Sequence, residues 1–200
     1  TNIAVVPYRQ FVAQHPDQST YFQPILDALD YQPSKLEIVP ALTIFEGKFD
    51  YYAMRYINEI ILDGKFKVHP YPGSGDNLLP VIRLYLSWGA RFIVVLDGDK
   101  AGQRAKQRYE KELGKIAQTL IFTLGDIKSE WAGATESLFT ETEKAQIVAK
   151  ANGPEGPVTK SALFTSIEAL LIAKTKVKLT KGTLSNFEAI FAFIHEKIKS

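Results

Sequence analysis

The sequence contains no cysteine among its 200 residues. This absence excludes disulfides, thiolate zinc sites and cysteine nucleophiles, so any metal would have to be bound by oxygen atoms or by histidine. It also fits a reducing compartment, and we expect a cytoplasmic protein. The three histidines, His15, His69 and His195, are scattered without the spacing that a metal site requires, so we interpret them as structural.

Long apolar runs are also missing. No stretch approaches the ~20 apolar residues of a membrane-spanning helix, and the N-terminus does not have the pattern of a signal peptide. We therefore expect a protein without a membrane partner, whose 46% apolar content suffices for a substantial core. The chain begins Thr1-Asn2-Ile3 without a methionine, and we interpret it as a fragment of a longer protein. The net charge of +2 is too small to indicate nucleic-acid binding by itself.

Two acidic clusters each follow directly on an apolar run. The runs and their acids are 41–45 with Glu46 and Asp50, and 92–96 with Asp97 and Asp99. Such β-branched and aromatic runs are typical of strands buried on both faces of a parallel sheet, where ligands bind at the carboxyl ends of the strands. Carboxylates gathered there repel one another unless a proton or a cation intervenes, and hard oxygen ligands suit Mg²⁺ or Mn²⁺. The sequence therefore predicts a divalent-metal site.

Strands and helices alternate between residues 41 and 124. The predicted strands are 41–45, 66–72, 92–96 and 119–124, and the predicted helices between them are 49–61, 78–86 and 100–113. This βαβαβαβ order indicates an α/β fold with parallel strands and right-handed crossovers. In the turn after the second strand, Gly73 and Gly75 either let the backbone approach a phosphate or only form a tight turn, with Asp76 as a helix cap.

The flanking segments are predicted to be helical, which gives three parts. Residues 1–40 form a lead-in from a missing upstream domain, with a short helix at 21–29; residues 41–135 form the α/β core; and residues 136–200 form a C-terminal helical subdomain. The predicted helices of this last part are 140–151, which opens with a Thr-x-x-Glu capping box, 160–172, and one with apolar residues from Leu184 to Ile198.

The acidic motifs resemble the Toprim domain, in which a glutamate follows the first strand and a DxD motif follows a later one. They are more similar still to the C-terminal nuclease region of the overcoming-lysogenisation-defect (OLD) family of ATP-dependent endonucleases. The motifs that carry the resemblance are EGKFDYY at 46–52, PGSG at 72–75 and LDGDKAG at 96–102. The resemblance implies a Toprim, Rossmann-like parallel sheet flanked by helices, with an additional C-terminal helical segment.

The resemblance also implies an activity. It predicts a DNA endonuclease or nickase that hydrolyses phosphodiester bonds with two Mg²⁺ or Mn²⁺ ions, joined in the full-length protein to an ABC-type ATPase domain. A role in phage defence follows by analogy, and a homo-oligomer formed through the missing region stays open. By their positions, Glu136 matches a further glutamate of the family and Lys160 a lysine close to the metals. The predicted metal ligands are Glu46, Asp50, Asp97, Asp99 and Glu136, and the predicted catalytic residues are Glu46, Lys160 and Lys48.

A row of cations recurs at helical spacing after the second acidic cluster. It consists of Lys100, Arg104, Arg108, Lys111 and Lys115. These side chains either follow a nucleic-acid backbone or form an ordinary solvated face balanced by Glu110 and Glu112.

Each assignment has a plainer alternative. The acids could serve as turn formers and helix caps, Glu136 could face solvent, and Lys160 could be an ordinary residue at a helix start. At the level of function, the alternatives are a Toprim nuclease that acts on RNA and a non-catalytic Toprim module that binds DNA or a partner. A primase would need template and nucleotide sites that the sequence does not contain, and a phosphoacceptor receiver domain would end in a fifth strand and helix.

Overall fold

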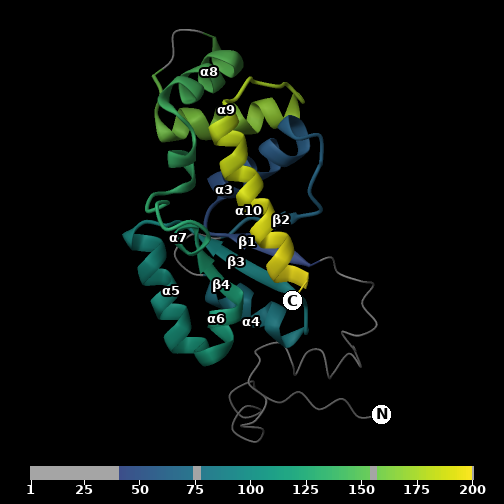
Figure 1. Cartoon of the computed structure of the whole chain (residues 1–200), viewed down its shortest axis with the longest axis vertical. Coiled ribbons are helices and arrows are strands. Elements are labelled where there is room, and N and C mark those ends of the chain that lie inside the picture. Colours follow the sequence, from purple (N-terminus) through teal and green to yellow (C-terminus); the bar gives the residue numbers. More distant parts are fainter. Residues whose placement is uncertain (1–40, 74–77, 154–156, 200) are drawn as a thin grey trace, which may run out of the picture. The chain divides into compact units, whose positions relative to one another are not determined.

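The computed structural model describes residues 41–73, 78–153 and 157–199 (Figure 1). The predicted lead-in 1–40 with its helix at 21–29 lies outside the described residues, as do Gly75 and Asp76. Residues 79–91 group apart from the rest of the described chain. They contain helix α4 (Leu79–Ser87), after which the ring of Trp88 meets that of Tyr85 edge-on at 5.9 Å. All elements described below belong to the larger unit.

The larger unit is built on a parallel sheet of four strands in the order β2-β1-β3-β4. The strands are β1 (Leu42–Phe45), β2 (His69–Tyr71), β3 (Phe92–Leu96) and β4 (Ile121–Thr123). In the register, Leu42 of β1 pairs with His69 of β2 and with Phe92 of β3, and Val94 of β3 pairs with Ile121 of β4. The predicted α/β class with a parallel sheet flanked by helices is therefore confirmed.

Two predicted strands are shorter than expected. The strand predicted at 66–72 begins only at His69, because the ring of Phe66 packs against Phe191 at 5.2 Å and the Asn58 side chain bonds both backbone polar groups of Phe66. The strand predicted at 119–124 covers only Ile121–Thr123. The residues before it form the one-turn helix α6 (Ala117–Leu120), and those after it form α7 (Leu124–Ile127).

The central strand β3 is buried on both faces of the sheet, with all five of its residues buried, whereas the edge strand β2 is partly exposed. Successive side chains of a strand point to opposite faces. Phe45, Ile93 and Val95 join one core with the helices α3 (Lys48–Arg55), α9 (Lys160–Ile172) and α10 (Lys181–Lys199). Helix α5 (Lys100–Leu113) also packs against β3 and β4, and its Tyr109 is buried.

Most helix boundaries agree with the sequence. Helices α5 and α9 begin and end where predicted, and α3 continues into a π-helical segment, η2 (Tyr56–Ile61), so that the helix predicted at 49–61 is present. This helix ends before Asp63 and Gly64, whose φ angles of 52° and 70° lie in the left-handed region that terminates helices. Short 3-10 turns occur at η3 (Gly114–Ile116) and η4 (Thr135–Leu138).

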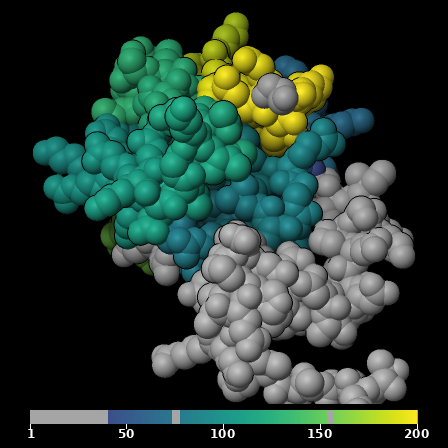
Figure 2. Space-filling model, turned by 90° about the horizontal axis from the view of Figure 1, so that it is seen from below, coloured from purple at the N-terminus to yellow at the C-terminus, as the bar shows by residue number. Residues whose placement is uncertain are grey.

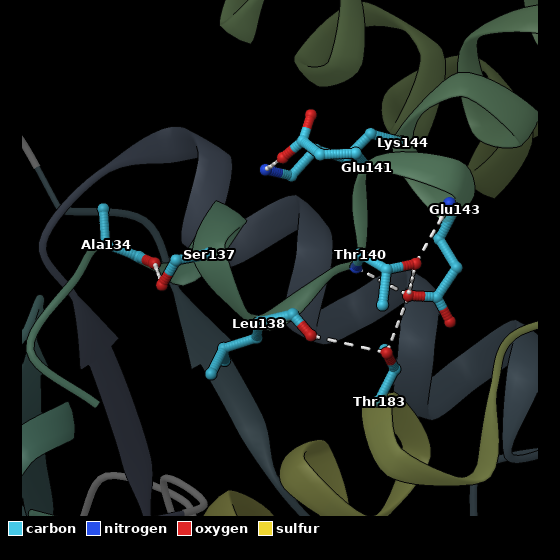
Figure 3. A network of polar contacts seen from close by, with 8 residues as sticks. All are labelled: Ala134, Ser137, Leu138, Thr140, Glu141, Glu143, Lys144 and Thr183. Carbon is cyan, nitrogen blue, oxygen red and sulfur yellow. Dashed lines mark hydrogen bonds and ion pairs between the residues drawn. The ribbon is translucent and has the colours of Figure 1, made fainter. Parts of the chain in front are cut away.

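The C-terminal helices are tied together by one buried carboxylate. Helices α8 (Glu141–Asn152) and α9 pack on each other. Helix α10 begins near these two helices and extends to the sheet, where it contacts β3 (Figure 1). Glu143, in the first turn of α8, accepts hydrogen bonds from the Thr140 backbone and hydroxyl, from the Thr180 backbone and from the Thr183 hydroxyl, as Figure 3 shows in part. The carboxylate thus joins the start of α8 to the start of α10. The predicted boundary near residue 136 stays a prediction.

We expect Glu143→Gln to destabilise the protein by roughly 2–3 kcal/mol, because an amide nitrogen would meet hydrogen-bond donors in a buried position. Burial raises the pKa of Glu143, but these hydrogen bonds outweigh it and hold the pKa below its usual value. The contribution of Glu143 to stability is therefore present at neutral pH and is lost in acid, as the pH falls through its lowered pKa. Urea unfolding at pH 7 tests the prediction. The control is Glu141→Gln on the same helix, where an exposed Glu141 pairs with Lys144, and an equal loss in both variants would contradict the prediction.

Candidate metal and phosphate site

The strand order creates a crevice at the carboxyl ends of β1 and β3. From β1 the chain crosses to β2 on one side, whereas from β3 it crosses to β4 on the other, and ligands of open α/β sheets bind at such a reversal. Glu46 follows β1 and Asp97 follows β3. The Glu46 carboxylate accepts a hydrogen bond from the Asp97 backbone at 3.0 Å. The two acidic clusters therefore meet, as the sequence predicts.

Asp50 and Asp97 are held by hydrogen bonds from nearby backbone groups. Asp50 lies in the first turn of α3, where its carboxylate accepts from the Gly47 backbone at 2.9 Å, and it is only 5% exposed. The Asp97 carboxylate accepts from the backbone and the hydroxyl of Thr135, at 2.9 and 3.3 Å. Thr135 stands one residue before the predicted ligand Glu136. Sequence reasoning missed it because its approach to Asp97 depends on the path of the chain after β4.

The pKa values of both aspartates are raised. Burial raises the pKa of Asp50 to about 6. Hydrogen bonds from Thr135 and Gly47 lower this pKa, whereas the charges of Glu46 and Glu136 raise it further. Burial also raises the pKa of Asp97 to about 7, with further contributions from the charges of Asp50, Glu46 and Glu136. The charges of Glu46 and Glu136 thus disfavour the ionisation of Asp50 and Asp97, which is the condition under which a cation or a proton is taken up.

Lys160 supplies a positive charge to the same cluster. Its ammonium group lies 2.6 Å from one oxygen of Glu136. Burial lowers the pKa of Lys160, but the pairing with Glu136 and the charges of Asp97 and Asp50 raise it above the usual value, so the side chain remains protonated. A cation at the start of α9 is unfavourable for the helix dipole. The acids therefore account for its position, and the structure brings together the predicted residues Lys160, Glu136, Asp97 and Asp50.

Asp99 and Lys48 lie differently from the other predicted residues. Asp99 is the N-cap of α5, and one of its oxygens accepts from the backbones of Ala101 and Gly102, both at 2.9 Å. Lys48 opens α3 with an exposed side chain. The helix-cap interpretation of Asp99 is therefore correct, and the metal-ligand role of Asp99 and the catalytic role of Lys48 stay predictions.

Two glycines allow the loops around the acids to pack closely. A side chain at Gly98 would overlap the backbone carbonyl of the buried Trp131, and one at Gly73 would overlap the carbonyl oxygens of Phe45 and Glu46. Backbone packing therefore explains Gly73 without a phosphate. This packing also places the loop after β2 against the backbone of Glu46, the first of the predicted acids.

The donor set fits a hard divalent cation in its chemistry. All of the clustered ligand atoms are carboxylate oxygens, and the second oxygen of Glu136 is buried without a hydrogen-bond partner among the described residues. Within the same residues, no three His, Asp or Glu side chains are arranged so that they could hold a metal ion as they stand. Glu46, Asp50 and Asp97 each accept hydrogen bonds from the protein, and Glu136 pairs with Lys160. Rotation of these side chains would be needed to gather their oxygens.

Part of the cationic row lies beside the acids. All five of its members are exposed, and Figure 2 shows the α5 region and the yellow end of α10 on one face of the molecule. Arg104 and Arg108 line a pocket of about 360 Å³ together with Glu46 and Tyr109. Arg108 donates to the Tyr109 hydroxyl at 3.1 Å and lies over its ring. The two arginines of the row thus border the first acid, whereas Lys111 and Lys115 do not line this pocket.

Comparisons with protein-family models, with curated proteins and with solved structures find no match to this chain. Among the described residues, no helix is long and apolar enough to cross a membrane.

We expect Asp97→Asn to stabilise the metal-free protein by roughly 1–3 kcal/mol at pH 8 and little at pH 4, because one pKa unit corresponds to about 1.4 kcal/mol. The folded state binds more protons than the unfolded state between pH 4 and 7, so wild-type stability falls as the pH rises through this window. Asparagine keeps the oxygen that accepts from Thr135 and removes the charge. Thermal melting in EDTA across this range measures the effect.

Asp126→Asn is the matched control for that experiment. Burial raises the pKa of Asp126, but hydrogen bonds from Lys106 and Thr123 outweigh it and lower the pKa, so removing this charge should destabilise the protein at neutral pH. If Asp97→Asn melts like the wild type at pH 8, the four acids do not repel one another as described.

Proposed function

We propose that this chain is a metal-dependent endonuclease domain that hydrolyses phosphodiester bonds of DNA. The observation that carries the proposal is the cluster of mutually repelling carboxylates at the β1–β3 crevice, with the protonated Lys160 beside it. Glu46, Asp50, Asp97 and Glu136 would hold Mg²⁺ or Mn²⁺, with Asp99 as a further oxygen ligand. The bound cations would supply an activated water and charge compensation for the attacking and leaving oxygens.

The chain's own residues have separate tasks in this proposal. Lys160 stabilises the negative charge that accumulates on the phosphoryl oxygens, because it is protonated and its partner Glu136 belongs to the same cluster. It does not act as a general base, since its pKa is raised. Arg104 and Arg108 contact the phosphates next to the cleaved bond, from the pocket that they share with Glu46. Thr135 holds the Asp97 carboxylate in its orientation.

The resemblance to the OLD family extends the proposal beyond this chain. It favours a Toprim, Rossmann-like fold and a cytoplasmic enzyme in which an ABC-type ATPase domain of the same full-length protein controls the nuclease. Phage defence is the biological role that this analogy suggests.

We expect the wild-type protein to nick supercoiled plasmid with Mg²⁺ or Mn²⁺ and not with EDTA, and Asp97→Asn to be inactive. Lys160→Met should lower the single-turnover rate by roughly 10²–10³ with little change in DNA affinity, because its interaction strengthens mainly as charge develops. Gel assays at saturating enzyme measure the rates, and Lys150→Met on α8 is the control. Lys160→Met cleaving normally would remove Lys160 from the mechanism.

The same assay separates the alternative functions. Metal-independent DNA binding without any cleavage by the wild type would favour a non-catalytic module. Cleavage of a matched RNA and not of DNA would favour the RNA nuclease.

We expect Arg104→Glu, alone or with Arg108→Glu, to weaken DNA binding for every sequence and to reduce the slope of log affinity against log salt by about 1 for each lost phosphate contact. The comparison variant is Lys111→Glu, because Lys111 lies on the same helix but does not line the pocket. A change in both variants means that the whole row follows the backbone, and a change only at the arginines assigns the contact to the pocket. If neither slope changes, the row is a solvated face. Lys150→Glu controls for net charge.

A further inference from the structure

A second pocket lies between the helices that carry the predicted site residues. Its volume is about 280 Å³, and its lining residues are Lys48, Tyr51, Tyr52, Pro72, Phe164 and Glu168. They come from α3, from α9 and from the residue after β2. The volume is close to the ~300 Å³ lower bound of small-molecule sites.

The walls of this pocket are aromatic and held in place. The ring of Tyr52 meets Tyr51 edge-on at 5.0 Å and Phe164 edge-on at 5.5 Å. Arg55 donates to the Tyr51 hydroxyl at 3.0 Å and lies over its ring. All three rings are partly exposed. An edge-on contact between two rings leaves ring faces available for stacking by a planar ligand.

The polar groups of the pocket are of two kinds. Lys48 supplies a cation to its lining. Glu168 supplies an acceptor, and its hydrogen bond with the Tyr52 hydroxyl raises the pKa of that phenol. A carboxylate has further lone pairs after accepting this bond. A planar ligand with an amino group at its edge and a phosphate attached would match the aromatic faces, the acceptor and the cation together.

The pocket and the acidic site draw residues from the same two helices, α3 and α9. On α9, Lys160, Phe164 and Glu168 follow one another at i, i+4 and i+8, so they lie on one side of the helix. At 1.5 Å rise per residue, Phe164 is about 6 Å and Glu168 about 12 Å along the axis from Lys160. On α3, Lys48, Tyr51 and Tyr52 adjoin Asp50, which belongs to the acidic cluster. These spacings correspond to a few nucleotides of a strand.

We propose that this pocket binds an unpaired nucleobase of the DNA strand whose backbone lies at the acidic site, with the base stacked on the face of one of the rings Tyr52 and Phe164 and edge-on to the other. The inference rests on the proposed function and adds the substrate class, DNA with a single-stranded segment beside the cleaved bond. Glu168 accepts from the exocyclic amine of cytosine or adenine, and thymine has no such amine at the corresponding position. The site therefore prefers cytosine or adenine to thymine.

Fluorescence anisotropy with labelled dC12 and dT12 in EDTA tests the proposal on the whole chain. Tyr52→Leu and Phe164→Leu keep an apolar side chain but remove the ring, so each should weaken dC12 binding by roughly 5- to 150-fold, the range measured for stacking of one base. The slope of log Kd against log salt should stay unchanged, because stacking releases no counterions. Glu168→Gln should reduce the ratio between the Kd values of dT12 and dC12.

The control is Phe193→Leu, which removes one ring of another edge-on pair, with Phe122 at 5.0 Å; neither residue lines the aromatic pocket or belongs to the acidic cluster. It should leave dC12 binding unchanged, and thermal melting of each variant checks the fold. The proposal is overturned if the wild type does not bind dC12, if the two ring variants bind it normally, or if they weaken a 12-base-pair duplex equally. It is also overturned if Glu168→Gln leaves the base preference unaltered. Because EDTA excludes cleavage, a protein that binds in this way and does not cut with metal would refute the nuclease proposal alone.

Discussion

Repulsion between buried carboxylates at the crevice of the sheet is the constraint around which the site is organised. The parallel order β2-β1-β3-β4 brings the ends of β1 and β3 together, and both ends carry acids. An ordinary core would not bury Asp50 beside Asp97, where burial raises both pKa values and the charge of Asp50 raises that of Asp97 further. Gly47 donates a hydrogen bond to Asp50, and Thr135 donates to Asp97. The repulsion between the negative charges that remains would be relieved by bound protons or cations. Strongly perturbed pKa values of this kind cluster at functional sites.

Much of this arrangement could be predicted from the sequence because the signals are local. The apolar run 92–96 is long enough and β-branched enough to define a buried strand, and Asp99 and Thr140 are N-caps that mark the starts of α5 and α8. Parallel pairing places Glu46 and Asp97 at the same edge of the sheet, and the adjacency of β1 and β3 brings them into contact. The shortening of the strand at 66–72 could not be predicted, because Phe66 is drawn into a core shared with Phe191, more than a hundred residues later.

The less predictable part of the site comes from chain segments that return to the sheet from a distance. Thr135 reaches Asp97 only because the loop after α7 passes over Gly98, where a side chain would not fit beside the Trp131 carbonyl. The family resemblance indicated Glu136 and Lys160, but not that they would pair with each other. The sequence showed five cations in one row, and only the folded helix distinguishes Arg104 and Arg108, which border Glu46, from Lys111 and Lys115.

The ion pair between Lys160 and Glu136 makes α9 a part of the acidic cluster's charge balance. A cation that bound Glu136 would compete with the lysine for the same oxygen, so the start of α9 would be released as the ion entered. Because α9 also carries Phe164 and Glu168, the acidic cluster and the aromatic pocket would then be thermodynamically linked. Such linkage is reciprocal: whatever the ion does to the affinity of the pocket for its ligand, that ligand must do, by the same factor, to the affinity for the ion.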